Sequence, residues 1–274
     1  MATLLGSDQP RISLELPEYS YGPMIEALSG NELVFICSVL TLAYAVKGAS
    51  SFGPSLIAVP MLTAIWPHPA VFLPSLALLN LSGNVLLLSR FFRAVEWKLV
   101  GILSLGTAVG VPVGIALLET LSSTALQLML AAGILGTLPI ALGKRPGFEL
   151  KPSHGFVAGC LSGVLGGSIG IDGPPYVIFL SALMGDDNEK RYATTIATFT
   201  IGCSVRATGF FVSGHLTGES AIAFLWGLPL MAIGIGLGVL VFRRLSRKGF
   251  DRLVAGVLVA TVVSLVVRVG STWA

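Results

Sequence analysis

Two short apolar segments, each broken by glycine and proline, carry the residue types best suited to bind a ligand. Residues 47–54 read KGASSFGP, and residues 166–175 read GGSIGIDGPP. Serine or aspartate ahead of Gly-Pro is typical of a helix start, and glycine lets a ligand approach the backbone closely. We therefore expect half-helices to begin after Gly53 and after Gly173, the second of them capped by Asp172.

Two helix starts that meet would favour an anion between them, because their free N–H groups and positive dipole ends point at it. From the two segments the sequence predicts these substrate-binding residues: Lys47, Gly48, Ser50, Ser51, Gly53, Gly167, Ser168, Gly170 and Gly173. Ser50 or Ser51 is the expected cap of the first half-helix. The alternative is that the glycines serve only close packing of membrane helices, as small residues commonly do.

Lys47 and Arg206 are the two basic residues that lie outside the expected loops. A charge at mid-membrane depth costs roughly 2.5–3.5 kcal/mol on insertion scales, so both are functional candidates. Thr198, Gly202 and Arg206 recur at four-residue spacing and share one helix face, which makes Thr198 and Arg206 predicted substrate contacts. The alternatives are structural pairing or snorkelling for Arg206, and a shallower position for Lys47.

Asp172 has two interpretations. As a helix cap it stabilises the half-helix, but its negative charge would repel the anion that the site otherwise favours. A proton on Asp172 would remove that conflict, so the residue is a candidate for proton coupling. Plain capping, or an ion pair with Lys47 or Arg206, is the other interpretation.

The two broken segments lie in two halves that align at an offset of 120 residues. Placing Gly53 on Gly173 also places Asn80 on Thr200 and Asn84 on Ser204. Asn80 and Asn84 could hydrogen-bond substrate, or they could bond neighbouring helices. Paired interruptions at matching positions of two halves are the best sequence indication of a transporter binding site.

Composition places the chain in a bilayer. Hydrophobic residues make up 54% and charged residues 11%, and the mean hydropathy is +0.85, all extreme for a soluble domain. The net charge of +3 is spread over short loops, so no nucleic-acid partner is expected. Three cysteines without CxxC spacing, and three histidines without carboxylates at ligand spacing, predict no disulfide framework, metal site, cofactor or enzyme active site.

Six apolar stretches are long enough to cross a core of about 30 Å as helices. They lie at 69–89, 98–118, 124–142, 192–213, 219–242 and 252–270. Four shorter ones flank the two breaks, at 33–47, 55–66, 154–165 and 174–184. We expect them to form two re-entrant hairpins whose tips lie inside the bundle, because non-helical backbone is tolerated at membrane depth only where protein or a wet cavity covers it.

Basic residues in the loops distinguish this arrangement from eight plain crossings. Lys47 and Arg206 aside, eight plain crossings would put 8 Lys and Arg on one side and 7 on the other, whereas two re-entrant hairpins give 13 against 2. The basic side is cytoplasmic by the positive-inside rule. The sequence therefore predicts an inverted repeat: a non-cytoplasmic tail at 1–31, a first repeat at 32–143, a cytoplasmic linker at 144–153 and a second repeat at 154–274.

In these segments the chain resembles the sulfite exporter TauE/SafE family of membrane permeases. The likeness rests on the run from Gly48 to Pro60, its partner from Gly166 to Pro175, Gly106, Gly110 and Gly114 after Glu96-Trp97, and Pro229, Gly234 and Gly238 before Arg243-Arg244-Leu245. The resemblance implies a multi-pass protein of the bacterial cytoplasmic membrane. It also implies transport of sulfite, sulfonates or related small sulfur-containing anions, usually outward.

Two other function classes stay open from the sequence. An anion channel would need a continuous wet pore, and a carrier could take an anion without sulfur. A membrane enzyme would need a nucleophile or metal set at membrane depth, which the sequence does not indicate. The expected partners are a small anionic substrate and the lipid bilayer, and a homodimer is the one protein assembly considered.

Overall fold

The computed structural model describes residues 28–50, 53–141, 150–184 and 187–242, and these are helical, with no strand among them. The helices are α1 Gly30–Ser50, α2 Pro54–Leu62, α3 Leu73–Phe91, α4 Trp97–Thr120, α5 Ser123–Ala141, α6 Gly155–Ile169, α7 Gly173–Met184, α8 Asn188–Val212 and α9 Gly218–Phe242. Short 3-10 turns lie at η1 Pro69–Val71, η2 Phe92–Ala94 and η3 Pro152–His154.

Five helices in the described part of the chain are long and apolar enough to cross a membrane. They cover Gly30–Gly48, Leu73–Ala94, Trp97–Thr120, Glu189–Val212 and Gly218–Leu240. The last four correspond to expected crossings, and α5 covers residues 124–141 of the expected stretch at 124–142. The sixth expected crossing, 252–270, lies outside the described residues.

The first helix is longer than the sequence analysis predicted. The stretch at 33–47 was expected to be too short to cross, yet α1 is a helix of 21 residues that continues to Ser50. Gly48 does not break α1 and serves close packing instead. A Cβ at this position would lie 2.5 Å from the carbonyl oxygen of Ile235, so only glycine lets α1 pack directly on α9 here. The break comes later, at Gly53, whose φ of 95° is a left-handed conformation that favours glycine.

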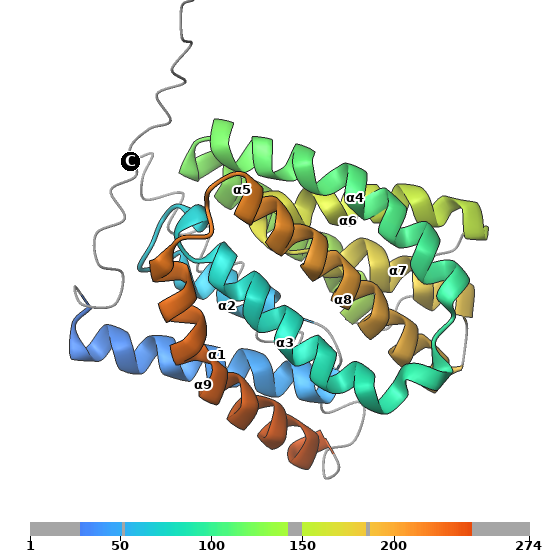
Figure 1. Cartoon of the computed structure of the whole chain (residues 1–274), viewed down its shortest axis with the longest axis horizontal. Helices are drawn as coiled ribbons and strands as arrows, with labels where there is room; N and C mark the ends of the chain where they lie inside the picture. The colour runs from blue at the N-terminus through green and yellow to red at the C-terminus, as the bar shows by residue number, and fades with distance from the viewer. Residues whose placement is uncertain (1–27, 51–52, 142–149, 185–186, 243–274) are drawn as a thin grey trace, which may run out of the picture.

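The two halves of the chain pack against each other through two tight helix pairs. Helix α4 lies against α6 and α1 lies against α9, with α3 and α8 between the two pairs (Figure 1). Small residues make the close approach: Gly114 of α4 faces Val164 of α6, and Gly234 of α9 faces Tyr44 of α1. These two contacts are related by the same offset of 120 residues, so the packing follows the register of the sequence repeat.

Helices α6 and α7 fold back on each other. Gly166 lies against Asp172 at the turn between them, and Gly155 at the start of α6 lies against the ring of Phe179. Gly170, with a φ of 73°, ends α6 in the left-handed conformation common at helix C-termini. The far end of α7 therefore returns toward the end of the molecule at which α6 begins.

At one end of the bundle, the turns after α2, α4 and α8 come together. Nδ1 of His68 accepts a hydrogen bond from the N–H of Ala70 at 3.3 Å, and this side chain is 6% exposed. Nδ1 of His215 lies 3.6 Å from a carboxylate oxygen of Glu119 and 3.0 Å from Oγ of Ser213. Polar contacts thus fix the ends of the helices relative to one another.

Candidate functional site

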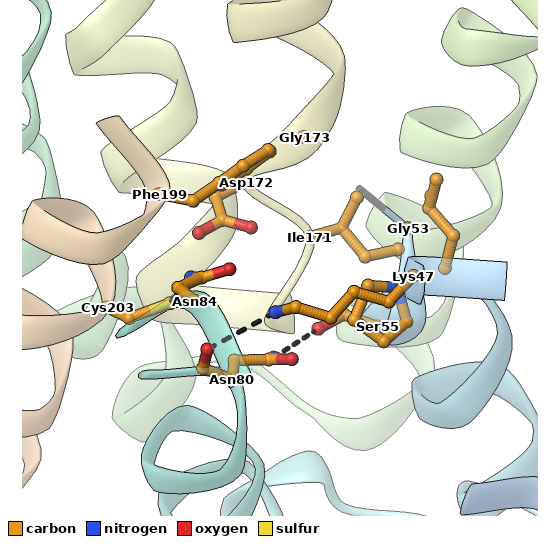
Figure 2. A pocket seen from close by; sticks show the side chains of 12 residues that line it. Lys47, Gly53, Ser55, Asn80, Asn84, Ile171, Asp172, Gly173, Phe199 and Cys203 are labelled. Carbon is orange, nitrogen blue, oxygen red and sulfur yellow. Dashed lines mark hydrogen bonds between the residues drawn. The ribbon is translucent and has the colours of Figure 1, made fainter. Parts of the chain in front are cut away.

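A small cavity lies where the two broken segments meet the middle of α3 and α8 (Figure 2). Its volume is about 20 Å³, enough for one water molecule. It is lined by Lys47, Gly53, Pro54, Ser55, Leu56, Asn80, Asn84, Ile171, Asp172, Gly173, Phe199 and Cys203. Both halves of the chain therefore contribute to one site, and six of the residues predicted from the sequence line it.

The N-termini of α2 and α7 both reach this cavity. Gly53 is the N-cap of α2 and Pro54 is its first residue, while α7 begins at Gly173. The N-cap of α2 is a left-handed glycine, which has no side chain to cap the helix, and the expected capping by Ser50 or Ser51 concerns side chains outside the described residues. Two positive helix ends facing one cavity favour a bound anion.

Lys47 is held beside the cavity by Asn80. Its ammonium group donates to the backbone carbonyl of Asn80 at 3.2 Å, and the lysine is 2% exposed. The Asn80 side chain is fully engaged, since Oδ1 accepts from the hydroxyl of Tyr44 at 3.1 Å and Nδ2 donates to Oγ of Ser55 at 3.0 Å. Asn80 thus joins α1, α2 and α3 and positions the lysine.

Arg206 pairs with Asp172 behind the cavity wall. Its guanidinium lies 3.3 Å from the carboxylate of Asp172, and it also donates to the carbonyl of Gly166 and to the sulfur of Cys203, each at 3.3 Å. The arginine side chain is 3% exposed and the aspartate 14%. Gly166 makes room for the pair, because a Cβ there would lie 3.1 Å from the guanidinium and 3.0 Å from Cβ of Asp172.

Asn84 is the other buried amide of the site. It is 1% exposed, and its Nδ2 lies 3.7 Å from the sulfur of Cys203. Its Oδ1 has no hydrogen-bond partner, and Nε of Arg206 is likewise unpartnered. Buried polar atoms are normally satisfied, so an unpartnered amide oxygen at a cavity indicates a place for a water or ligand atom.

The charges at the site sum to a net positive one. Lys47 and Arg206 are cations and Asp172 is an anion, and Figure 2 shows the ammonium of Lys47 and the carboxylate of Asp172 directed toward the same space beside Asn84. One uncompensated positive charge in a buried cavity attracts one negative charge. The arrangement can therefore bind a small anion electrostatically.

Several residues predicted to bind substrate lie away from the cavity. Gly48 and Gly167 pack against the backbones of α9 and α4, and Gly170 ends α6. The hydroxyls of Ser168 and Thr198 donate within their own helices, to Val164 and Thr194 at 2.7 and 2.8 Å. Arg206 reaches the cavity only through Asp172 and Cys203. The side chain of Ser50, and all of Ser51, lie outside the described residues.

Seven other residues at the site were not predicted from the sequence to bind substrate: Tyr44, Pro54, Ser55, Leu56, Ile171, Phe199 and Cys203. Tyr44 and Ser55 are ordinary helix residues whose role depends on the position of Asn80 on another helix. Cys203 precedes Arg206 by three residues and so shares its helix face, a spacing that could have indicated it. For Phe199 the sequence carries no distinguishing signal.

Comparison with known proteins places these features in a family. The model of the sulfite exporter TauE/SafE family matches residues 36–265. The chain is 28% identical over 231 residues to a Cupriavidus necator protein described as "Probable sulfite/organosulfonate exporter TauE", a match covering 82% of this chain and 90% of that protein. No solved structure matches the chain.

Proposed function

Because the chain belongs to the sulfite exporter TauE/SafE family, we propose that it is a secondary transporter that exports small sulfur-containing anions, sulfite or organosulfonates, across the bacterial cytoplasmic membrane. The observation that carries the proposal is the buried cavity with two helix N-termini, Lys47 and one net positive charge. A sulfonate, which has one negative charge, would neutralise that site as it stands.

The family predicts the chemistry of the substrate, and the cavity predicts how its charge is balanced. A sulfite dianion would leave the site one charge too negative unless a proton accompanied it. Asp172 is the acidic side chain at the cavity and would take that proton. Proton coupling through Asp172 thus follows from charge balance.

Arg206 acts in this proposal as a positioning residue. It holds the carboxylate of Asp172 and the sulfur of Cys203 from behind, so it sets the charge and shape of the cavity without lining it. Protonation of Asp172 would weaken the pair and free the arginine to approach the anion. Arg206→Lys is expected to retain only part of the function. The ammonium keeps the positive charge, but it cannot contact the carboxylate, the sulfur and the Gly166 carbonyl together.

The present conformation corresponds to an occluded state. A cavity for one water molecule is too small for a sulfonate, so the helices around it must separate for entry and release. The fold-back of α6 and α7 supports a re-entrant hairpin in the second half, and the equivalent packing of α1 on α9 and of α4 on α6 supports the inverted repeat, through which α1 and α2 would form the matching hairpin. Alternating access would then be a movement of one half against the other.

The same topology puts both termini outside the cytoplasm. Cysteine labelling of intact cells tests it: single cysteines at positions 5 and 272 are expected to react with a membrane-impermeant reagent, and those at 145 and 247 are not. The opposite pattern would contradict the inverted repeat but not the anion site.

Binding to the purified protein tests the function. Sulfite and ethanesulfonate are expected to bind with saturation, and acetate more weakly. Lys47→Met is expected to abolish anion binding, whereas Lys98→Met, at an exposed lysine on α4, is the matched control and leaves it unchanged. Equal binding by Lys47→Met and the wild type would refute the proposed site.

Transport in vesicles tests the coupling. Asp172→Asn is expected to keep binding a sulfonate but to lose acceleration of sulfite transport by a pH gradient. A gradient effect that persists in Asp172→Asn would assign the coupling elsewhere. Saturable flux and exchange of labelled for unlabelled anion distinguish a carrier from the alternative of an anion channel.

A further inference from the structure

We propose that Asn84 makes the site selective for sulfonates that carry a hydroxyl group, because its amide oxygen is placed to accept a hydrogen bond from the substrate. The inference rests on the proposed function, since it concerns the same cavity. The inference goes beyond the proposed function because it names a second group on the substrate, opposite the charged sulfonate.

The first observation is the unpartnered oxygen. Asn84 is 1% exposed and lines the cavity, and Oδ1 has no hydrogen-bond partner while Nδ2 lies beside the sulfur of Cys203. A buried acceptor left unsatisfied costs stability, and the cavity beside it has room for one water molecule. The oxygen is therefore satisfied by a donor that occupies the cavity, first water and then substrate.

The second observation is that the N–H and O–H groups around the cavity do not hydrogen-bond to the amide oxygen of Asn84. Asn80 receives the ammonium of Lys47 on its backbone and the hydroxyl of Tyr44 on its side chain. The two terminal nitrogens of Arg206 donate to Gly166 and Cys203, and its Nε makes no hydrogen bond to Asn84 or to any other described group. The two asparagines thus differ, although they are one turn apart on α3: Asn80 is part of the frame of the site, and Asn84 presents a free acceptor to the cavity.

The charge of the site decides which donor fits. An ammonium group on the substrate would be repelled by the net positive charge of Lys47, Arg206 and Asp172, and a zwitterion would leave that charge unbalanced. A hydroxyl donates a hydrogen bond without adding charge. A hydroxyalkyl sulfonate therefore satisfies both the cation and the amide oxygen.

The test compares two ligands that differ by one oxygen. Isothermal titration of the purified full-length protein is carried out with ethanesulfonate and with 2-hydroxyethanesulfonate, and 2-aminoethanesulfonate is the third arm. The wild type is expected to bind the hydroxylated sulfonate about tenfold more tightly than ethanesulfonate, the effect of one buried hydrogen bond. Tighter binding of the amino compound would overturn the choice of hydroxyl.

Variants connect the preference to the residue. Asn84→Leu, similar in volume, is expected to bring the affinity ratio of the two ligands to about one while ethanesulfonate binding changes less than about threefold. Asn84→Ala replaces the leucine variant if that variant does not fold. The control is Ser82→Ala on the same helix, because the hydroxyl of Ser82 donates to the carbonyl of Leu78 and does not line the cavity. Thermal unfolding checks that each variant is folded.

The outcomes separate this inference from the proposed function. Equal weakening of both ligands in Asn84→Leu would show that the amide contacts the sulfonate itself and would overturn the inference. A ratio that stays at tenfold would place the hydroxyl elsewhere and also overturn it. Failure of the wild type to bind any of the sulfonates would refute the proposed function together with this inference.

Discussion

The ion pair between Arg206 and Asp172 allows the most quantitative prediction. Its closest atoms are 3.3 Å apart, and the two side chains are 3% and 14% exposed. At an effective dielectric constant of about 20, the attraction between unit charges at that distance is about 5 kcal/mol. Desolvation offsets much of this energy, but removing one partner leaves the other charge buried, which typically costs about 3–5 kcal/mol.

A double-mutant cycle measures the pair without assuming its net value. Arg206→Met and Asp172→Asn are each expected to lower the free energy of unfolding by about 3–4 kcal/mol. The double variant is expected to lose about the same amount as either single one, because neither charge is left unpaired. The interaction energy of the cycle is then about 3 kcal/mol, well above the scatter of independent sites.

The assay is equilibrium unfolding in mixed micelles, followed by circular dichroism. The matched control is the pair of Lys190 and Glu96, which is closer, at 2.7 Å, but has side chains 46% and 38% exposed. The cycle of Lys190→Met and Glu96→Gln is expected to give under about 1 kcal/mol, since water screens exposed pairs. Additive effects at Arg206 and Asp172, within about 0.5 kcal/mol, would refute the argument that burial makes this pair strong.

Two further predictions concern packing and pH. Gly163→Ala is expected to destabilise the protein by about 1–3 kcal/mol, because its Cβ would lie 2.8 Å from the carbonyl oxygen of Thr107 on α4. Gly101→Ala is the control and is expected to leave stability unchanged, because the space around Gly101 is open. Denaturant unfolding of the two variants measures the difference. Burial lowers the pKa of His68, so the unfolded chain takes up a proton that the folded one excludes. Stability is therefore expected to fall as the pH drops below about 6.5, and the pH dependence of the thermal unfolding temperature should flatten in His68→Gln.

The sequence indicated where the candidate cavity lies better than it indicated which residues line it. Glycine and proline mark breaks because of local backbone chemistry, so Gly53 and Gly173 could be placed at helix starts. The membership of the chain in the TauE/SafE family, expected from its glycine motifs, is confirmed. The asparagines of α3 were predicted because they align with Thr200 and Ser204 in the second half of the chain, and both line the cavity.

What the sequence could not supply is the rotation of one helix against another. Arg206 was expected to contact the substrate because a charge at membrane depth is costly, and an ion pair with Asp172 was the alternative. The structure has that ion pair, with Asp172 on a segment whose orientation follows from packing. Gly48 was expected at the site and instead packs on α9, which also explains why α1 is longer than predicted. Tertiary contacts of this kind have no periodic signature.

The pairing of α1 with α9 and of α4 with α6 determines how long each helix waits for its partner during synthesis. Gly114 and Val164 are about 50 residues apart in the chain, but Tyr44 and its partner Gly234 are separated by about 190. At roughly 5–20 residues per second, α1 waits on the order of 10–40 s for α9, while α4 waits about 2.5–10 s for α6. During that interval we expect lipid to cover the face of α1 that α9 will occupy, so that the bilayer protects this helix until α9 is made.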